Sequence, residues 1–452
     1  MKSINPFTEE VIAEYKELNS EEIEQRLVLA ENAFGAWRKT NFVERKEKML
    51  VLARLLREQK REMAEIATRE MGKPITQSIA EVEKCAMLCE YYAQNAEYIL
   101  KEEYITTDAS ESFVRFDPIG IVLAVMPWNF PYWQVLRFIV PAAMAGNVGV
   151  LKHASNVQGC AGAIERIFLE AGFPEGVFQN LSIVSSQVEA VVRDARIKAV
   201  TLTGSEYAGR KVAEVAGDEV KHSVLELGGS DPFIVLSDAN LDLVEKMAPI
   251  ARLQNCGQSC IAAKRFIVVE SIAQEFLKRF KNSFENYIVG DPMDEKTQMG
   301  PMVNESSCDE IQKQVQDSIA AGAVLVTGGK RLEGKGFFYA PTILSNVKKG
   351  MRAYSEEMFG PLASVIVVQD ENEAVKVAND TSFGLGSSIW TADIQKAKEL
   401  ARHIHAGNVF INAIVKSDPR LPFGGIGRSG YGRELSHYGI KEFVNIKTVW
   451  IQ

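Results

Sequence analysis

The chain contains few residues of the kinds that build metal centres or disulfide frameworks. Only 5 histidines and 6 cysteines occur among its 452 residues. The cysteines are scattered, and no two of them have the CxxC spacing of a zinc or dithiol site, so we expect reduced thiols and no metal. Two cysteine pairs lie four residues apart and leave metal or redox pairing open: Cys85 with Cys89, and Cys256 with Cys260.

Long apolar runs and dense basic runs are also missing. No stretch approaches the ~18 uninterrupted apolar residues that a membrane span needs. The first residues, MKSINPFTEEVIAEY, lack the apolar core of a signal peptide, and we therefore expect a cytoplasmic protein without a membrane partner. The 51 Lys and Arg against 59 Asp and Glu give a net charge of −8, so nucleic acid is not an expected partner.

The chain is long enough for several domains with large cores. Hydrophobic residues make up 46% of its 452 residues, and ~100–200 residues per domain predicts two to four domains. From residue 20 to about 104, apolar residues recur at steps of three and four, as on one face of a helix. Ser20 indicates one helix start, and Asn41 with Glu44 indicates a second.

The pattern changes near residue 112 to short β-rich runs that alternate with helical stretches. This alternation predicts an α/β fold with two parallel-sheet, Rossmann-like domains, whose ligands bind beyond the carboxyl ends of the strands. The runs are IGIVLAVM, NVGVLKH, VFQNLSIV, KAVTLTG, DPFIVLSD, RFIVVE, AVLVTGG, ASVIVV and GNVFINA. The final segment, KEFVNIKTVWI, is an apolar strand that we expect to pair with another chain or with the SFVRF segment, which favours an oligomer.

Two glycine-containing turns are candidates for binding a phosphate. GIGRSG, from Gly425 to Gly430, fits GxGxxG, but no strand directly precedes it and too little chain follows for a βαβ unit. We therefore interpret it as a loop in which backbone packs closely. Gly204 and Ser205 instead follow the predicted strand 198–203 and open a helix, where free N–H groups and the helix dipole favour an anion such as a pyrophosphate.

Three side chains have the chemistry of a nucleophile, a base and an oxyanion donor. Cys260, in NCGQSCIAAKRF, follows a turn, so its thiol is expected at a loop edge, although most cysteines are small buried hydrophobes. Glu226, in VLELGGSDP, lies between apolar neighbours that would raise its pKa toward that of a general base; a structural carboxylate is the alternative. Asn129, in PWNFP, is either an oxyanion donor or a plain turn residue.

Six motifs give the whole chain a resemblance to the aldehyde dehydrogenase superfamily, in the order that the family has them. They are PWNFP (127–131), LTGS (202–205), LELGGSDP (225–232), GQSC (257–260), EEMFGP (356–361) and PFGGIGRSGYGRE (422–434). The resemblance implies NAD(P)-dependent oxidation of an aldehyde to a carboxylic acid. It also implies a cofactor-binding domain over 1–227, with 105–118 in an oligomerisation arm, a catalytic domain over 228–420, and a return to the first domain over 421–452 in a homodimer or homotetramer.

The same resemblance implies roles for individual residues. Cys260 attacks the aldehyde, Asn129 and the Cys260 N–H hold the oxyanion, and Glu226 activates the water that hydrolyses the thioester. Cofactor contacts are implied for Trp128, Lys152, Gly204, Ser205, Glu357 and Phe359. Ser155 stands three residues after Lys152, where a glutamate would repel a 2'-phosphate, so we expect NADP to be preferred to NAD.

The short length and the C-terminal sequence are most similar to short bacterial succinate-semialdehyde dehydrogenases. Such a substrate carries a carboxylate, and we expect Arg137 to bind it, about 80° from Asn129 on a continuous PYWQVLRF helix, with Ser417 as a second donor. A structural ion pair of Arg137 is the alternative. Cys256 stands where threonine or asparagine is commoner and is a candidate for a redox disulfide with Cys260.

Several other functions stay open on the sequence alone. Aliphatic aldehydes and aminoaldehydes are alternative substrates for the same chemistry. A CoA-acylating or phosphate-dependent relative would share the thioester step but would not need Glu226 as a base. A catalytically silent binding homologue and a cysteine hydrolase are the remaining alternatives.

Overall fold

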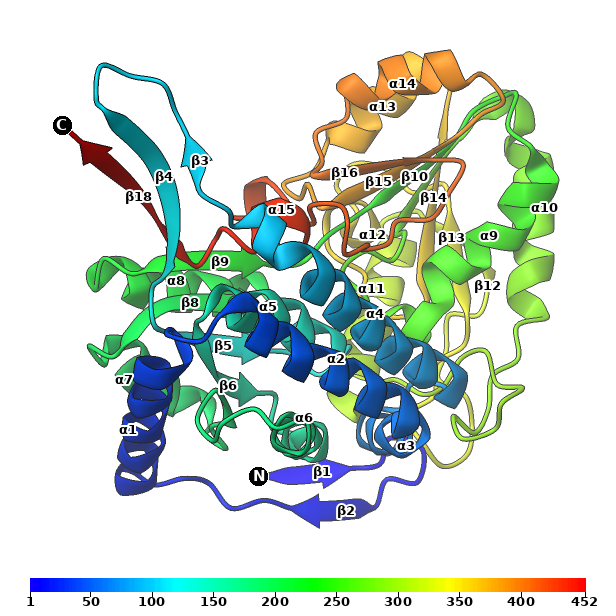
Figure 1. Ribbon diagram of the computed structural model, residues 1–452. Helices are drawn as coiled ribbons and strands as arrows, with labels where there is room; N and C mark the ends of the chain where they lie inside the picture. Colours follow the sequence, from blue (N-terminus) through cyan, green and yellow to red (C-terminus); the bar gives the residue numbers. More distant parts are fainter.

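A helical block follows a short N-terminal ribbon and covers one side of the molecule (Figure 1). The computed structural model describes residues 1–452. Strands β1 (Lys2–Ile4) and β2 (Val11–Glu14) pair antiparallel. The helices are α1 (Ser20–Trp37), α2 (Phe42–Glu58), α3 (Lys60–Met71) and α4 (Ile75–Ile99), which confirms the predicted helical region.

The first two helices begin at asparagine caps. Asn19 precedes α1 and forms a capping box with Glu22, and Asn41 precedes α2 and forms one with Glu44. The start predicted at Asn41 is confirmed. The start predicted at Ser20 is also confirmed, because α1 begins at Ser20 and the amide oxygen of Asn19 caps it by accepting from the Glu22 N–H.

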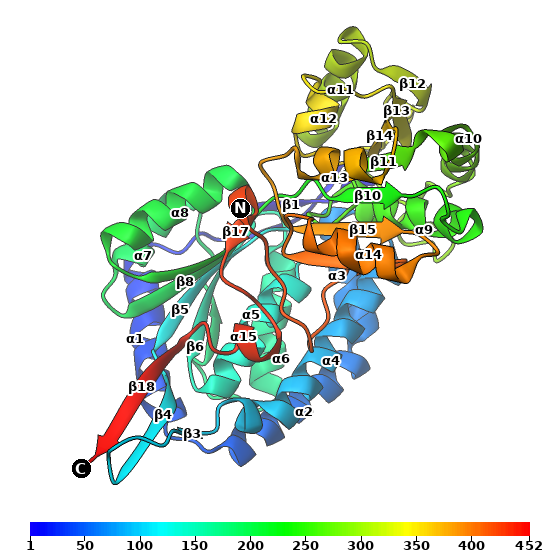
Figure 2. The same ribbon diagram turned by 90° about the horizontal axis from the view of Figure 1, so that it is seen from above.

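The first large sheet has the strand order β17-β9-β8-β5-β6-β7 and is parallel except for β17. Helices α5 and α6 lie on one face of this sheet and α8 lies on the other (Figure 2). Its strands are β5 (Ile121–Met126), β6 (Val148–His153), β7 (Phe178–Asn180), β8 (Ile197–Thr203), β9 (His222–Glu226) and β17 (Gly430–Tyr431). Its helices are α5 (Trp133–Ala145), α6 (Gln158–Glu170), α7 (Val188–Arg193) and α8 (Glu206–Asp218).

The second large sheet has the order β12-β13-β14-β11-β10-β15-β16 and is parallel except for β12. The two sheets confirm the predicted α/β class. The strands are β10 (Pro232–Val235), β11 (Arg265–Val269), β12 (Val324–Thr327), β13 (Thr342–Ser345), β14 (Leu362–Val368), β15 (Gly386–Trp390) and β16 (Asn408–Ile411). The helices are α9 (Leu241–Leu253), α10 (Glu270–Glu285), α11 (Glu305–Ala320), α12 (Arg352–Ser355), α13 (Glu371–Asn379) and α14 (Ile394–Arg402).

A small antiparallel sheet projects from the body next to the C-terminus (Figure 1). Strand β18 (Val444–Ile451) pairs with β4 (Glu111–Pro118), which in turn pairs with β3 (Glu103–Tyr104). The predicted pairing of the C-terminal strand with the SFVRF segment is therefore confirmed. Large apolar side chains remain exposed on this sheet, among them Ile446 and Trp450.

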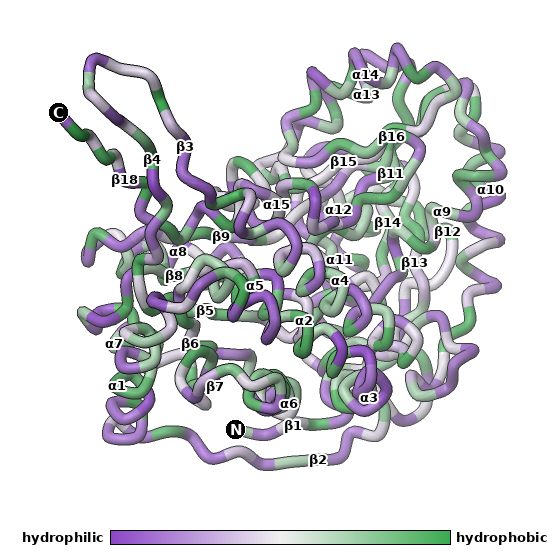
Figure 3. Tube along the Cα trace, viewed as in Figure 1, coloured by the Kyte–Doolittle hydropathy of each residue, from purple (hydrophilic) through white to green (hydrophobic).

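The buried apolar residues form two separate cores. One core gathers residues between Leu27 and Leu227 and adds Val303, Leu385 and C-terminal residues such as Phe443. The other core lies between Phe233 and Ile404. We propose on this distribution the domain limits 1–227, 228–420 and 421–452. Figure 3 shows the apolar residues concentrated along the central strands and polar residues along outer helices such as α10 and α14. None of the helices combines the length and apolar character that crossing a bilayer requires.

Candidate active site

A cavity of about 310 Å³ opens where the first sheet meets the loop before β11. The carboxyl ends of β5 and β8, together with the residues after β9, supply one wall, as expected for a parallel sheet. Seven residues that the sequence pointed to line this cavity: Trp128, Asn129, Gly204, Ser205, Cys260, Glu357 and Phe359. Segments up to 231 positions apart therefore meet at one place.

Cys260 lies in the turn that leads from α9 into β11. Its side chain is partly exposed and packs against the first core. Burial raises the pKa of the Cys260 thiol to about 12, while the charges of Lys264 and Arg137 lower it and those of Glu357 and Glu226 raise it further. The thiol is thus protonated at neutral pH in the cofactor-free protein, and its proton must pass to a base when the sulfur reacts.

Lys264 fixes the turn that contains Cys260 by hydrogen bonds to its backbone carbonyls. Its buried ammonium donates to the Ser259 carbonyl at 2.8 Å and to the Cys260 carbonyl, and it lies 3.5 Å from the Glu357 carboxylate. Burial lowers the pKa of Lys264. Nothing in the sequence singles out this lysine, because it lies directly before β11 and its partner Glu357 comes from a distant segment.

Asn129 is fixed by hydrogen bonds on both sides of its amide. Its Nδ2 donates to the Gln258 carbonyl at 3.0 Å, and its Oδ1 accepts from Gln134 Nε2 at 3.1 Å. One hydrogen of Nδ2 remains available to a ligand in the cavity. Helix α5 begins only at Trp133, so Asn129 lies in the turn before it. The angle of about 80° expected between Asn129 and Arg137 was conditional on a helix that extends back to Asn129, and this condition is not met.

Glu226 ends β9 and is buried, with 2% of its surface exposed. Neither carboxylate oxygen has a hydrogen-bond partner in the protein. Burial, and then the charge of Glu434, raise the pKa of Glu226 well above its usual range, while Arg137 and Arg433 lower it. Gly424 passes so close that an added Cβ would lie 2.8 Å from Oε1, which leaves the carboxyl group no room on that side.

Arg137 is engaged by partners within the protein. Its Nε forms a buried ion pair with Glu434 Oε2, and its Nη2 donates to Thr203 Oγ1 at 3.4 Å. Its guanidinium carbon lies 4.9 Å from the centre of the Phe423 ring. The structure thus gives Arg137 the ion pair that was the alternative from sequence. Its Nη1 donates to no group of the protein.

Ser417 contacts a lysine that the sequence does not single out. Lys84, on α4, donates from Nζ to Ser417 Oγ at 2.7 Å and lies 4.1 Å from the centre of the Trp133 ring. Lys84 and Ser417 are 333 positions apart in the chain. Lys84 lies on α4 and Ser417 in the loop after β16, so only the tertiary fold brings them together.

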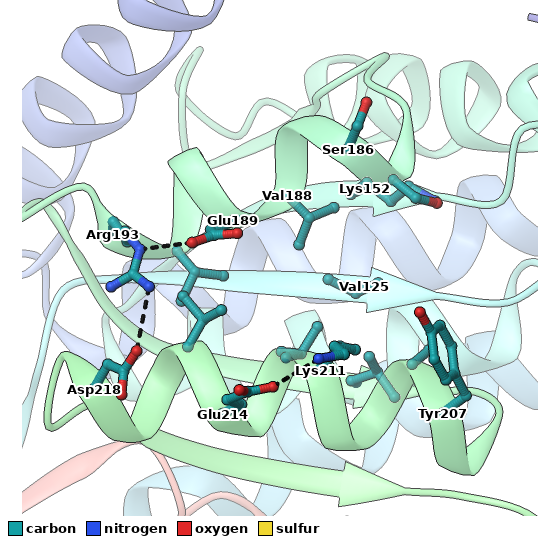
Figure 4. A pocket seen from close by; sticks show the side chains of 16 residues that line it. Val125, Lys152, Ser186, Val188, Glu189, Arg193, Tyr207, Lys211, Glu214 and Asp218 are labelled. Atoms are coloured by element: carbon teal, nitrogen blue, oxygen red, sulfur yellow. Dashed lines mark hydrogen bonds and ion pairs between the residues drawn. The ribbon is translucent and has the colours of Figure 1, made fainter.

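A second, larger cavity of about 570 Å³ lies on the other side of the β8–α8 turn. Figure 4 shows Lys152 and Ser186 on one side of it and Tyr207 and Lys211, from α8, on the other. Lys152 is buried without a carboxylate partner, and burial lowers its pKa. Ser155 follows the end of β6 by two residues but is not among the lining residues.

The two cavities together suit an elongated dinucleotide with its pyrophosphate between them. Thr203 and Ser205 line the smaller cavity, and Leu202 and Tyr207 line the larger one, so the start of α8 separates them. Ser205 caps this helix by accepting from the Ala208 N–H at 3.3 Å. The Gly204 N–H donates to the Glu226 carbonyl at 3.0 Å. An anion at this helix start would therefore bind the free N–H groups of the first turn of α8.

The GIGRSG segment has a packing role at the edge of the first sheet. Gly430 pairs with Glu226 in β17, and an added Cβ there would lie 2.0 Å from the Leu225 carbonyl oxygen. Ser429 Oγ donates to the Gly228 carbonyl at 2.7 Å. The segment lines neither cavity, in agreement with the interpretation that it is not a phosphate loop.

The cysteines are all free thiols in this structure. Cys85 and Cys89 are buried in the first core, and no group of metal-ligating side chains is found. Cys256 belongs to the second core and its Sγ donates to Met302 Sδ at 3.6 Å. A disulfide between Cys256 and Cys260 would require this buried thiol to leave Met302, because Cys260 packs against the other core.

Comparisons of this chain with known protein families and with known proteins all indicate the same family. A family model described as the aldehyde dehydrogenase family matches residues 1–449. A probable succinate-semialdehyde dehydrogenase (NADP+) of Synechocystis is 51% identical over 449 residues, which cover 99% of each chain. Succinate-semialdehyde dehydrogenase (NADP+) 1 of Mycobacterium tuberculosis is 48% identical over 452 residues, again 99% of each chain.

Solved structures with the same fold include one that holds a nicotinamide cofactor. The succinic semialdehyde dehydrogenase of Streptococcus pyogenes in complex with NADP+ has a TM-score of 0.98 and is 39% identical. It covers 100% of this chain, and this chain covers 99% of it. A Sinorhizobium meliloti NAD-dependent aldehyde dehydrogenase, 33% identical, has a TM-score of 0.97.

Proposed function

The chain belongs to the aldehyde dehydrogenase family, which oxidises aldehydes with NAD or NADP, and from this premise we propose that its substrate is succinate semialdehyde and its preferred cofactor NADP. The observation that carries the proposal is that Cys260 and Asn129 line one cavity, with Glu226 buried behind it. Relatives at 48–51% identity along the whole chain are named for this substrate and this cofactor.

In the proposed first step, the Cys260 sulfur bonds to the aldehyde carbon, and the thiol proton passes to a water molecule in the cavity. The carbonyl oxygen becomes an oxyanion, which accepts from the free hydrogen of Asn129 Nδ2 and from the Cys260 N–H. The hydrogen bonds of Asn129 to Gln258 and Gln134 hold its amide in place before the substrate arrives. This preorganisation lowers the barrier because no donor must reorient during the reaction.

A bound NADP would supply the acceptor for the hydride that leaves the substrate carbon. Glu357 and Phe359 are proposed to position its ribose and its ring, and Phe359 packs edge-on against Trp128 with ring centres 5.9 Å apart. Glu226 then takes a proton from water, which attacks the thioester and releases the acid together with the restored thiol. The unpartnered oxygens of Glu226 leave it free to accept that proton.

The cofactor preference is assigned to Lys152 and Ser155. The unpaired ammonium of Lys152 suits a 2'-phosphate in the larger cavity, and a serine at 155 adds a donor where a glutamate would repel. Ser155→Glu is expected to lower kcat/KM for NADP relative to NAD by about tenfold or more. An unchanged ratio of the two kcat/KM values would count against the assignment.

The substrate proposal is tested by a screen of aldehydes with NADP, in which succinate semialdehyde is compared with butanal and an aminoaldehyde. The proposal expects the highest kcat/KM for succinate semialdehyde, without added CoA. A higher kcat/KM for butanal or for the aminoaldehyde would show that the enzyme oxidises that class of aldehyde by the same chemistry, and succinate semialdehyde would no longer be the proposed substrate. Reduction of NADP that depends on CoA would indicate an acyl-CoA product instead.

We also propose that the protein is a cytoplasmic homo-oligomer, a dimer or a tetramer. The six free thiols fit a reducing compartment. The projecting sheet of β18, β4 and β3 exposes Tyr104, Ile446 and Trp450, which suits contact with a second copy. Light scattering at several protein concentrations measures the assembly, and a monomer at all of them would overturn it.

A further inference from the structure

Lys84 is a largely buried cation with no anion beside it. Its ammonium donates to Ser417 Oγ at 2.7 Å and faces the Trp133 ring at 4.1 Å, and it forms no ion pair with any carboxylate of the protein. Removing an ammonium group from water costs free energy that a neutral hydroxyl and an aromatic face only partly return. The arrangement therefore lacks a negative charge that a ligand would bring.

The neighbouring acidic groups are already paired with other cations. Glu81, one turn before Lys84 on α4, binds the buried ammonium of Lys73 and accepts from the Tyr132 and Trp133 N–H groups. Asp418 pairs with Arg420 at 2.7 Å. The nearby cation Arg137 has its own buried partner in Glu434, so the charge of Lys84 is the one left without a partner.

A second donor at the same place also lacks a partner. The indole Nε1 of Trp133, whose residue is only 5% exposed, donates to no group of the protein. A buried N–H without an acceptor is rare in folded proteins and calls for a ligand or a water. The next residue on α5, Gln134, lines the active-site cavity and donates to Asn129.

We propose that Lys84 and Ser417, beside the unpartnered indole N–H of Trp133, bind the distal carboxylate of an aldehyde that ends in a carboxyl group. This inference rests on the proposed function and adds the residue that supplies the positive charge. Ammonium and hydroxyl groups both donate to a carboxylate, and such charge-assisted hydrogen bonds are roughly twice as strong as neutral ones. In this proposal Arg137 stabilises Glu434, and only its free Nη1 could donate to the substrate.

The test compares Lys84→Met with Lys84→Arg, using kcat/KM for succinate semialdehyde and for butanal with saturating NADP. Methionine keeps the apolar length over Trp133 and removes the charge. We expect Lys84→Met to lower kcat/KM for succinate semialdehyde by about 10- to 100-fold, mainly through KM, and to change that for butanal less than about twofold. Lys84→Arg should keep most of the discrimination.

A matched control removes a lysine that faces an aromatic ring elsewhere. Lys101 lies 4.4 Å from the centre of the Tyr98 ring on the exposed surface after α4, and Lys101→Met should leave both kcat/KM values unchanged. If Lys84→Met does not fold, Ser417→Ala provides the second variant, with a smaller loss confined to succinate semialdehyde. Inhibition by succinate gives a further measure, since its inhibition constant should rise with the same variants.

The outcomes separate this inference from the function on which it rests. A wild-type enzyme without preference for succinate semialdehyde over butanal overturns both. A wild-type preference that survives in Lys84→Met and Ser417→Ala overturns the role of Lys84 and Ser417 alone. Equal losses on both aldehydes would show that Lys84 supports the fold and not the carboxylate, and would overturn the inference as well.

Discussion

Two buried cations beside the active site differ in how their charge is balanced. Arg137, on α5, has Glu434 as a partner inside the protein, and both side chains are almost fully buried. Lys84, on α4, has only a hydroxyl and an aromatic ring. A charge that the protein compensates by itself is a structural element, whereas a charge without a partner is available to a ligand. We therefore assign Arg137 to the stability of the site and Lys84 to the binding of the substrate.

The region of Arg137 also contains the proposed base, which gives the largest expected effect. Glu226→Gln removes the group that activates water, and kcat should fall by about 10²- to 10⁴-fold. NADPH should still form in a rapid first turnover, because the steps up to the thioester do not need the base, and stopped-flow absorbance would record that burst. If Glu226→Gln lowered kcat and also abolished the burst of NADPH, Glu226 would be needed before or during thioester formation.

Removing Arg137 from its ion pair with Glu434 tests whether this pair stabilises the fold. Arg137→Met leaves Glu434 buried without its cation and should lower the free energy of unfolding by about 3–5 kcal/mol. The double variant Arg137→Met with Glu434→Leu should recover much of this loss, because no uncompensated charge remains. Lys84→Met should not destabilise the protein. Urea unfolding followed by circular dichroism measures all three, and equal destabilisation by Arg137→Met and Lys84→Met would remove the distinction between them.

Changing the pH tests the charge of Lys84 without a mutation. Burial, and then the charge of Arg137, lower the pKa of Lys84 to about 8, while the charges of Cys85, Glu81 and Asp418 act in the opposite direction. Lys84 is therefore protonated below pH 8 and loses its charge as the pH rises through that value. KM for succinate semialdehyde should rise up to about tenfold per pH unit above 8 relative to butanal. Lys84→Arg should not show this rise, and an identical rise there would assign it to another group.

The smallest expected effect concerns Cys256. Its thiol is fully buried beside Met302 in the second core, and burial raises its pKa, so it should react slowly with oxidants. Cys256→Ser and wild type should thus lose activity at similar rates in hydrogen peroxide and recover similarly with dithiothreitol. Recovery in wild type alone would instead support the disulfide with Cys260 that the spacing allows.

The sequence predicted more of the reacting end of the site than of its distal end. Asn129, Cys260 and Glu357 were found because they belong to short contiguous motifs, and the structure brings all three to one cavity. Lys84 and Lys264 were missed because they lie in ordinary helical and strand patterns. The angle expected between Asn129 and Arg137 required a continuous helix, and the helix begins four residues after Asn129, which the local pattern does not reveal.

The sequence left two partners open for the C-terminal strand, but by itself it predicted the α/β class and the candidate reacting groups. These features depend on periodicity and on motifs of a few adjacent residues, whose physical causes are local. Only the tertiary structure decided which cation is balanced and which is free, since Arg137 meets Glu434 and Lys84 meets Ser417 across some 300 positions of chain. Charge balance depends on distance in space, and that distance is set by the packing of α4, α5 and the C-terminal loops against one another.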